Sequence, residues 1–175
     1  MLVPAIMHEE ELKKKMRSIW FEDKYKYFIY NNYCSDIQID KDSWNKHQFV
    51  SIDSSGNIIG YIAYEVCRQT NACERMVAIN FTDNIAIFGM DLGQALKDIF
   101  EKFKFRKLNF SVVVGNPIER SYDKLIQKYN GRIVGVYKKD ALLIDGEYYD
   151  KKAYEIMRED YMEAIRLRGY KKVME

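Results

Sequence analysis

Cysteine and histidine are scarce in this sequence of 175 residues, which has three cysteines and two histidines. Cys34, Cys67 and Cys73 are odd in number and show no C-x-x-C spacing, so the sequence predicts neither a zinc cluster nor a redox pair. Cys67 and Cys73 flank a predicted hairpin turn, and we expect them to be small buried side chains. His8 and His47 lie far apart in the sequence. We therefore expect reduced thiols, a cytoplasmic protein and no metal site.

A strong charge of either sign is also missing. The chain has 28 lysines and arginines against 26 aspartates and glutamates, which leaves a net charge of +2. This balance provides no broad field to attract nucleic acid or an anionic membrane, so neither is an expected partner. Residues 1–7 are apolar but shorter than the apolar core of a signal peptide, and acidic residues follow them. We expect an opening strand there, and no apolar run reaches the length of a membrane span.

Familiar nucleotide-binding and hydrolase motifs are absent from the sequence. It contains no G-x-G-x-x-G, no P-loop and no G-x-S-x-G. It also lacks an internal repeat, a low-complexity segment and a linker. We therefore expect a single domain over residues 1–175, long enough to bury about two-thirds of its extended-chain surface.

Hydrophobic periodicity predicts the elements of the first two-thirds of the chain. A stripe of apolar residues among charged ones predicts a helix over 9–30. Alternating apolar residues between 48 and 81 predict three antiparallel strands joined by two polar turns. A second stripe predicts a helix over 91–105, for which Asp91 is the expected N-cap.

The stretch from Leu108 to Asn116 is the most informative part of the sequence. An apolar strand over 107–115 ends at Gly115 and Asn116 and turns directly into a predicted helix over 117–129. Units of this kind bind ligands at the carboxyl end of the strand. The sequence therefore predicts a cleft beside Gly115 and Asn116.

The last third of the chain reads as two strands and a helix. Strands are predicted over 132–143 and 147–157, joined at Asp145 and Gly146, a pair typical of hairpin turns. A short helix is expected from Arg158 onward.

This order of elements resembles the GCN5-related N-acetyltransferase (GNAT) superfamily over nearly the whole chain. Three local features carry the resemblance: the glycine-containing turn over 88–96, Asn116 after the fifth strand, and the final hairpin leading into the strand and helix over 146–161. The resemblance implies an α/β (α+β) fold. Its sheet is expected to be mixed, mostly antiparallel and six- to seven-stranded, with a splay between the fourth and fifth strands and about four flanking helices.

The resemblance also implies acetyl-CoA as co-substrate. Its pyrophosphate is expected at the turn before the helix, its pantetheine arm near Asn116, and its thioester against an amide of the fourth strand. The residues expected to contact it are Ile79, Phe81, Gly89, Met90, Asp91, Leu92, Gly93, Gln94, Asn116 and Ser121. The family motif in this turn is Gln or Arg, two residues, Gly, one residue, then Gly or Ala. Here Phe88, Asp91 and Gly93 occupy these positions, and only Gly93 fits; its alternative role is close packing of helix against strand.

Candidate catalytic residues follow from the chemistry of amine acylation. Family members commonly carry a tyrosine that protonates the departing thiolate, but Ile126 occupies its place here. Tyr122, one turn earlier, is the nearest substitute, because a phenol of pKa about 10 is able to protonate a thiolate; its alternative role is packing of the helix on the sheet. Asp83 and Glu65 are the candidate bases, with Glu155 a weaker third choice, and their alternative role is that of solvated carboxylates.

Two functions of different classes remain open. The first is an acetyl-CoA-dependent N-acetyltransferase in which a primary amine, on a small molecule or a peptide, attacks the thioester directly. The second is a noncatalytic GNAT-fold module that binds CoA, protein or RNA, and the departures in the 88–96 turn favour it. The terminal hairpin and the aromatic-rich helix are candidate surfaces for a homodimer.

Overall fold

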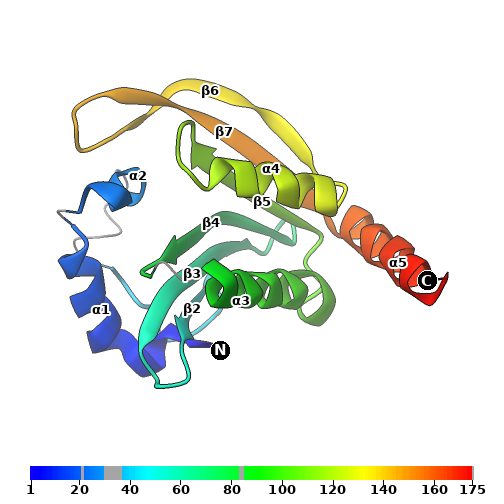
Figure 1. The fold of residues 1–175 in the computed structure, drawn as a ribbon, viewed down its shortest axis with the longest axis horizontal. Helices are drawn as coiled ribbons and strands as arrows, with labels where there is room; N and C mark the ends of the chain where they lie inside the picture. The colour runs from blue at the N-terminus through cyan, green and yellow to red at the C-terminus, as the bar shows by residue number, and fades with distance from the viewer. Residues whose placement is uncertain (21, 30–36, 83–84, 175) are drawn as a thin grey trace.

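A twisted seven-stranded sheet forms the centre of the molecule (Figure 1). The structure is a computed structural model and describes residues 1–20, 22–29, 37–82 and 85–174. The strand order is β1-β2-β3-β4-β5-β7-β6, and all neighbours are antiparallel except β4 and β5. The predicted mixed sheet is thus confirmed. The strands are β1 (Leu2–Pro4), β2 (Lys46–Ile52), β3 (Ile58–Cys67), β4 (Ala72–Asn80), β5 (Lys107–Val113), β6 (Arg132–Leu142) and β7 (Tyr148–Met157).

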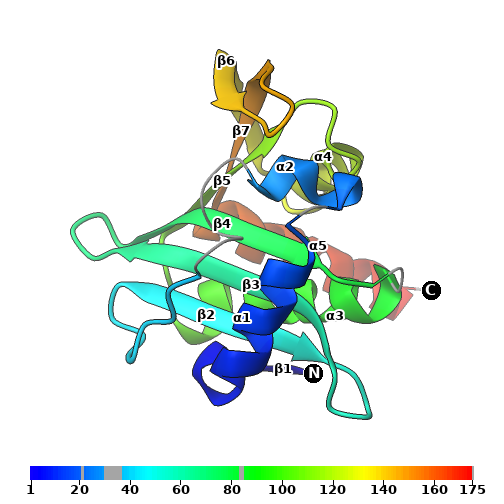
Figure 2. The ribbon, with the colours of Figure 1, turned by 90° about the vertical axis from the view of Figure 1, so that its left-hand side faces the viewer.

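Helices cover both faces of the sheet (Figure 2). The α-helices are α1 (Glu9–Ser18), α2 (Lys26–Ile29), α3 (Ile85–Lys97), α4 (Glu119–Lys128) and α5 (Arg158–Met174). Short 3-10 helices η1 (Ala5–His8) and η2 (Asp23–Tyr25) precede α1 and α2, and a π-helix, η3 (Asp98–Lys102), continues α3. Within the described ranges, no helix is both long and apolar enough to cross a membrane.

Three predicted boundaries at the two ends of the chain were wrong. The opening strand ends at Pro4, because proline lacks the N–H that would continue the ladder, and the chain turns into η1. The helix predicted over 9–30 stops after Ser18, with Ile19 buried at its C-cap, and helix resumes only in η2 and α2. The terminal helix α5 is not short but spans 17 residues.

The start of α3 also differs from the prediction, because the helix begins at Ile85 and Asp91 lies in its middle. Asp91 is therefore not an N-cap. Its buried carboxylate accepts a hydrogen bond of 2.5 Å from the Ser51 hydroxyl and lies 3.0 Å from the Met1 ammonium. These contacts attach α3 to β1 and β2. The turn predicted over 88–96 is accordingly helical.

The predicted splay lies between β4 and β5. These parallel strands pair only where Ala72 and Cys73 lie beside Lys107 and Leu108. Beyond this point β4 follows β3 as far as Asn80, whereas β5 follows β7. An extra residue in β4 at a register shift, where Arg75 has a φ of 51°, bends the strand away from β5. The two strands therefore part toward their carboxyl ends and leave a gap in the sheet.

Candidate functional site

A small cleft occupies the gap between β4 and β5. It is therefore located at the carboxyl end of β5, where the strand-to-helix unit predicted a ligand site. Its lining consists of residues 76–79 of β4 and 111–113 of β5, together with Asn116, Ile118 and Tyr122 around the start of α4, and Tyr27 and Phe28 of α2.

The cleft has two halves, because successive side chains of a strand point to opposite faces of the sheet. On the face covered by α4, Met76 and Val112 pack in one cluster with Tyr122. We call this the α4 half. On the opposite face, Val77 and Ile79 pack in a cluster with Phe28, and Val113 packs with Tyr27. We call this the α2 half, and Ser111 points to the same side as Val113.

Backbone amides of β4 line the gap. The Phe81 amide does not face it, because it donates a 2.9 Å hydrogen bond to the Ile59 carbonyl of β3. Among the amides expected to polarise the thioester, near Ile79 to Phe81, that of Phe81 is therefore already bonded within the sheet. Since amides alternate along a strand, the Ile79 amide also points to β3, whereas that of Ala78 points toward the gap.

Tyr122 lies on the first half of α4 and lines the cleft. Its side chain is 5% exposed and its ring packs edge-on against Phe110, with centroids 5.1 Å apart, and against Tyr154 at 6.1 Å. The Tyr122 ring therefore packs α4 against the sheet and also lies beside the cleft. The geometry is compatible with both roles predicted for this tyrosine.

Gly115 and Asn116 form the turn between β5 and α4. Gly115 has a φ of +91°, a backbone conformation that favours glycine, and a Cβ added there would lie 3.5 Å from the Tyr27 hydroxyl. Buried Asn116 accepts a 3.1 Å hydrogen bond from the Ile118 amide through Oδ1, which fixes the start of α4. Asn116 therefore shapes the cleft through the backbone as well as lining it.

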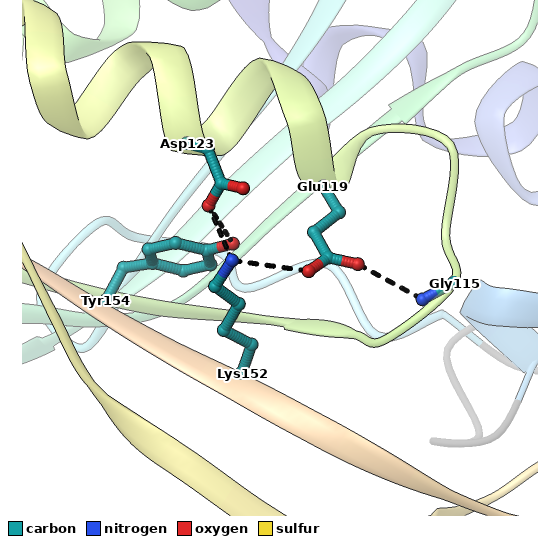
Figure 3. Close-up of polar contacts among 5 residues, drawn as sticks. All are labelled: Gly115, Glu119, Asp123, Lys152 and Tyr154. Atoms are coloured by element: carbon teal, nitrogen blue, oxygen red, sulfur yellow. Dashed lines mark hydrogen bonds and ion pairs between the residues drawn. The ribbon is translucent and has the colours of Figure 1, made fainter.

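A network of charged side chains connects α4 to β7 beside this turn (Figure 3). Lys152 Nζ lies 2.8 Å from Asp123 Oδ1 and 3.3 Å from Glu119 Oε1, while the other oxygen of Glu119 accepts a 3.1 Å hydrogen bond from the Gly115 amide. The Tyr154 hydroxyl donates to Asp123 at 2.9 Å. The hydrogen bond from Lys152 lowers the pKa of Asp123, and the same bond raises the pKa of Lys152. Sequence reasoning missed this network.

Two of the candidate bases, Glu65 and Glu155, do not line the cleft. Glu65 lies on β3 opposite Glu74, near the amino end of β4, where β4 and β5 are still paired. Its carboxylate lies 3.3 Å from the Arg75 guanidinium. Glu155 bonds to Arg132 and Lys107, and these contacts lower its pKa against the opposing effect of burial. Asp83 lies outside the described residues, as do its neighbour Asn84 and Cys34.

The residues predicted to hold the pyrophosphate lie along α3 and do not line the cleft. Met90 is 68% exposed, and Gln94 donates to Asp98 on the same helix. A Cβ added at Gly93 would meet nothing within 4 Å, so close helix packing does not explain this glycine. Ser121 is exposed on α4.

The described cysteine, histidine and acidic side chains do not gather into a metal or redox site. Among residues 1–20, 22–29, 37–82 and 85–174, no group of three histidine, cysteine or acidic side chains is placed to hold a metal ion. Cys67 lies opposite Ala72 and Cys73 opposite Val66, so the two thiols do not face each other. Cys73 is buried as expected, and Cys67 is partly exposed.

Comparison with known proteins identifies the fold. A chimera of the spermidine N-acetyltransferase SpeG from Vibrio cholerae and hSSAT matches with a TM-score of 0.65 and 20% identity, covering 93% of this chain and 98% of that one. The spermidine/spermine N-acetyltransferase SpeG from Vibrio cholerae matches at 0.63 and 20%, covering 93% and 95%. A GCN5-related N-acetyltransferase from Brucella melitensis matches at 0.66 and 16%, covering 93% and 77%.

These similarities show that the chain has the fold of the GCN5-related N-acetyltransferase superfamily. Neither a protein-family model nor a curated protein sequence matches it.

Proposed function

We propose that this protein is an acetyl-CoA-dependent N-acetyltransferase that acts on a primary amine. The cleft between the parted strands β4 and β5 is the observation that carries this proposal. Its lining comes from side chains on both faces of the sheet, and the proposed reaction brings the acyl donor from one face and the amine from the other. The acetyltransferase names of the structural neighbours support the same class of reaction.

The reaction requires one bond exchange and two proton transfers. The amine forms a C–N bond with the acetyl carbon while the C–S bond of the thioester breaks; the nitrogen loses a proton and the departing sulfur gains one. Catalysis in such a site comes mainly from orientation, with acid–base assistance. Tyr122 is the proposed proton donor to sulfur, since it lines the α4 half of the cleft. The Ala78 amide is the proposed donor that polarises the carbonyl.

The α4 half is the proposed place of the pantetheine arm, with Asn116 alongside it. The amino end of α3, where the helix dipole is positive, is the proposed place of the pyrophosphate. Gly89 and Gly93 lie one turn apart on α3, and both have open space where a side chain would be. The two glycines therefore leave room for acetyl-CoA along the helix, and both are proposed to contact it.

A noncatalytic CoA-binding module is the second candidate. It is favoured by Phe88 and Asp91, which replace the usual residues of the pyrophosphate motif, since the Asp91 carboxylate serves to anchor α3. Two measurements separate the candidates. Acetyl-CoA is expected to raise the melting temperature in both cases, because a ligand that binds the native state stabilises it. Release of CoA thiol on addition of amines is expected only for the enzyme.

The proposed assembly is a homodimer formed through the terminal hairpin. The outer strand β6 presents Ile133, Val134, Val136 and Tyr137 with between 50% and 55% of each exposed. Apolar side chains grouped on an edge strand are typical of a surface that pairs with another chain. Light scattering coupled to gel filtration is expected to give a dimer mass for the wild type and a monomer mass for Val136→Lys.

A further inference from the structure

We infer that the acceptor is a primary monoamine whose amine is attached to an apolar group. This inference rests on the proposed function and concerns the α2 half of the same cleft. Two of the structural neighbours carry the name of a polyamine, spermidine, whose several ammonium groups need negatively charged partners. The α2 half of this protein has a different chemistry.

The α2 half presents apolar and aromatic surface. Val77, Ile79 and Val113 form one wall, and Tyr27 and Phe28 form the other. Its polar side-chain groups are the hydroxyls of Ser111 and Tyr27, and main-chain groups of the strands add further polar surface. Within the part of the chain that the structure describes, the lining of the cleft includes no acidic and no basic side chain.

The aromatic wall is held in place by contacts between α2 and the turn between β6 and β7, which lie near each other in both views (Figures 1 and 2). Lys26 Nζ lies 3.7 Å from Asp145 Oδ2 and over the ring of Tyr149 at 5.6 Å. The Tyr149 hydroxyl donates to Asp145 at 2.8 Å, and the Tyr149 ring meets that of Tyr27 edge-on with centroids 6.5 Å apart. Tyr27 is thus fixed beside Gly115, and Phe28 follows it in the helix.

This chemistry discriminates between classes of amine. An ammonium group carried into an apolar wall without a carboxylate partner is strongly disfavoured, so a second or third ammonium opposes binding. An apolar group on the amine gains from the same burial. An apolar surrounding also lowers the pKa of the attacking amine, which favours the neutral, nucleophilic form. The α2 half therefore selects a monoamine and helps to prepare it for attack.

Phenethylamine, ethylamine and spermidine test this inference as acceptors for acetyl-CoA. We expect kcat/KM for phenethylamine to exceed that for the other two by at least about tenfold, the scale on which apolar pockets discriminate. In Phe28→Ala, kcat/KM is expected to fall about tenfold for phenethylamine and to change little for ethylamine. In Phe28→Glu, the preference is expected to shift toward spermidine. Tyr148→Ala is the matched control, because this aromatic residue of the hairpin is 60% exposed.

Unchanged affinity for acetyl-CoA, measured by calorimetry, shows that each variant is folded. Spermidine turnover equal to or above that of phenethylamine would overturn the inference while leaving the proposed enzyme intact. Amine binding to the CoA-bound protein is measured by calorimetry as a second readout. Phenethylamine binding without turnover would reject the enzyme but retain the apolar amine site. If phenethylamine neither binds nor reacts, the inference is wrong.

Discussion

Replacement of Tyr122 by phenylalanine separates the two roles that its position allows. The substitution keeps the ring, and therefore the edge-on contacts with Phe110 and Tyr154. It removes only the hydroxyl, so we expect the free energy of unfolding to fall by about 1 kcal/mol, the usual net contribution of a hydrogen bond.

The expected kinetic effect is much larger. Loss of a general acid lowers kcat by a factor on the order of 10²–10⁴, which corresponds to about 2.7–5.4 kcal/mol in the activation free energy. The affinity for acetyl-CoA is expected to remain almost unchanged, because the cleft keeps its shape. Stopped or continuous assays of thiol release give kcat, and calorimetry gives the affinity.

Tyr129→Phe is the matched control for this experiment. Tyr129 follows α4, is 8% exposed and stacks on Tyr161 with centroids 4.8 Å apart, but it does not line the cleft. We expect its kcat to stay at the wild-type value. A Tyr122→Phe enzyme with wild-type kcat and reduced stability would refute the catalytic role and assign Tyr122 to packing.

Three further substitutions test the helix, the charged network and a close packing contact. Gly93→Leu is expected to raise the melting temperature, because glycine disfavours helix, and to weaken acetyl-CoA binding in calorimetry. Lys152→Met is expected to lower stability in urea at neutral pH. Because the pKa of Asp123 lies below its usual value of 3.8 in the folded state, the difference from wild type is expected to shrink as the pH falls below that value. Gly131→Ala is expected to cost about 1–3 kcal/mol in urea unfolding, since its Cβ would lie 2.7 Å from a backbone oxygen, whereas Gly135→Ala, with nothing within 4 Å, is the control.

Each of these predictions has an outcome that contradicts it. Unchanged acetyl-CoA affinity in Gly93→Leu would move the cofactor away from this face of α3. A Lys152→Met difference that persists unchanged from pH 7 to pH 3 would show that the ion pair with Asp123 does not contribute to stability. Equal stability of the Gly131 and Gly135 variants would show that the backbone near Gly131 relaxes at no cost.

The sheet and the position of the cleft were predictable because their signals are local. Alternation marked the strands between 48 and 81, and the apolar strand ending at Gly115 and Asn116 marked the turn into α4. The start of α3 was not predictable in the same way. Residues 85–88 are all apolar and show no polar face, so periodicity detected the helix only from Asp91 onward. The contact between Asp91 and Ser51 spans 40 residues.

Part of the site depends on contacts between distant segments. Glu119 and Asp123 are four residues apart on α4, a spacing that places both on one face of a helix. This spacing is the one sign of the charged network in the sequence. Their partner Lys152 lies on β7, 29 residues from Asp123, and nothing in the sequence pairs them. The same is true of Tyr27 and Phe28, which reach the cleft only because α2 packs on the hairpin. The residues predicted along α3 were selected by likeness to a motif, and the helix geometry separates them from the cleft.

Hydrogen–deuterium exchange with and without acetyl-CoA tests most directly whether the gap between β4 and β5 holds the acyl donor. We expect slower exchange on binding in peptides that cover 76–80, the first turn of α3 and the turn at Gly115 and Asn116. Exchange over 132–137 of β6 is expected to stay unchanged, because β5 and β7 separate this outer strand from the gap. No protection at saturating acetyl-CoA, or protection that spares both 76–80 and the turn at Gly115 and Asn116, would show that the gap does not hold the acyl donor.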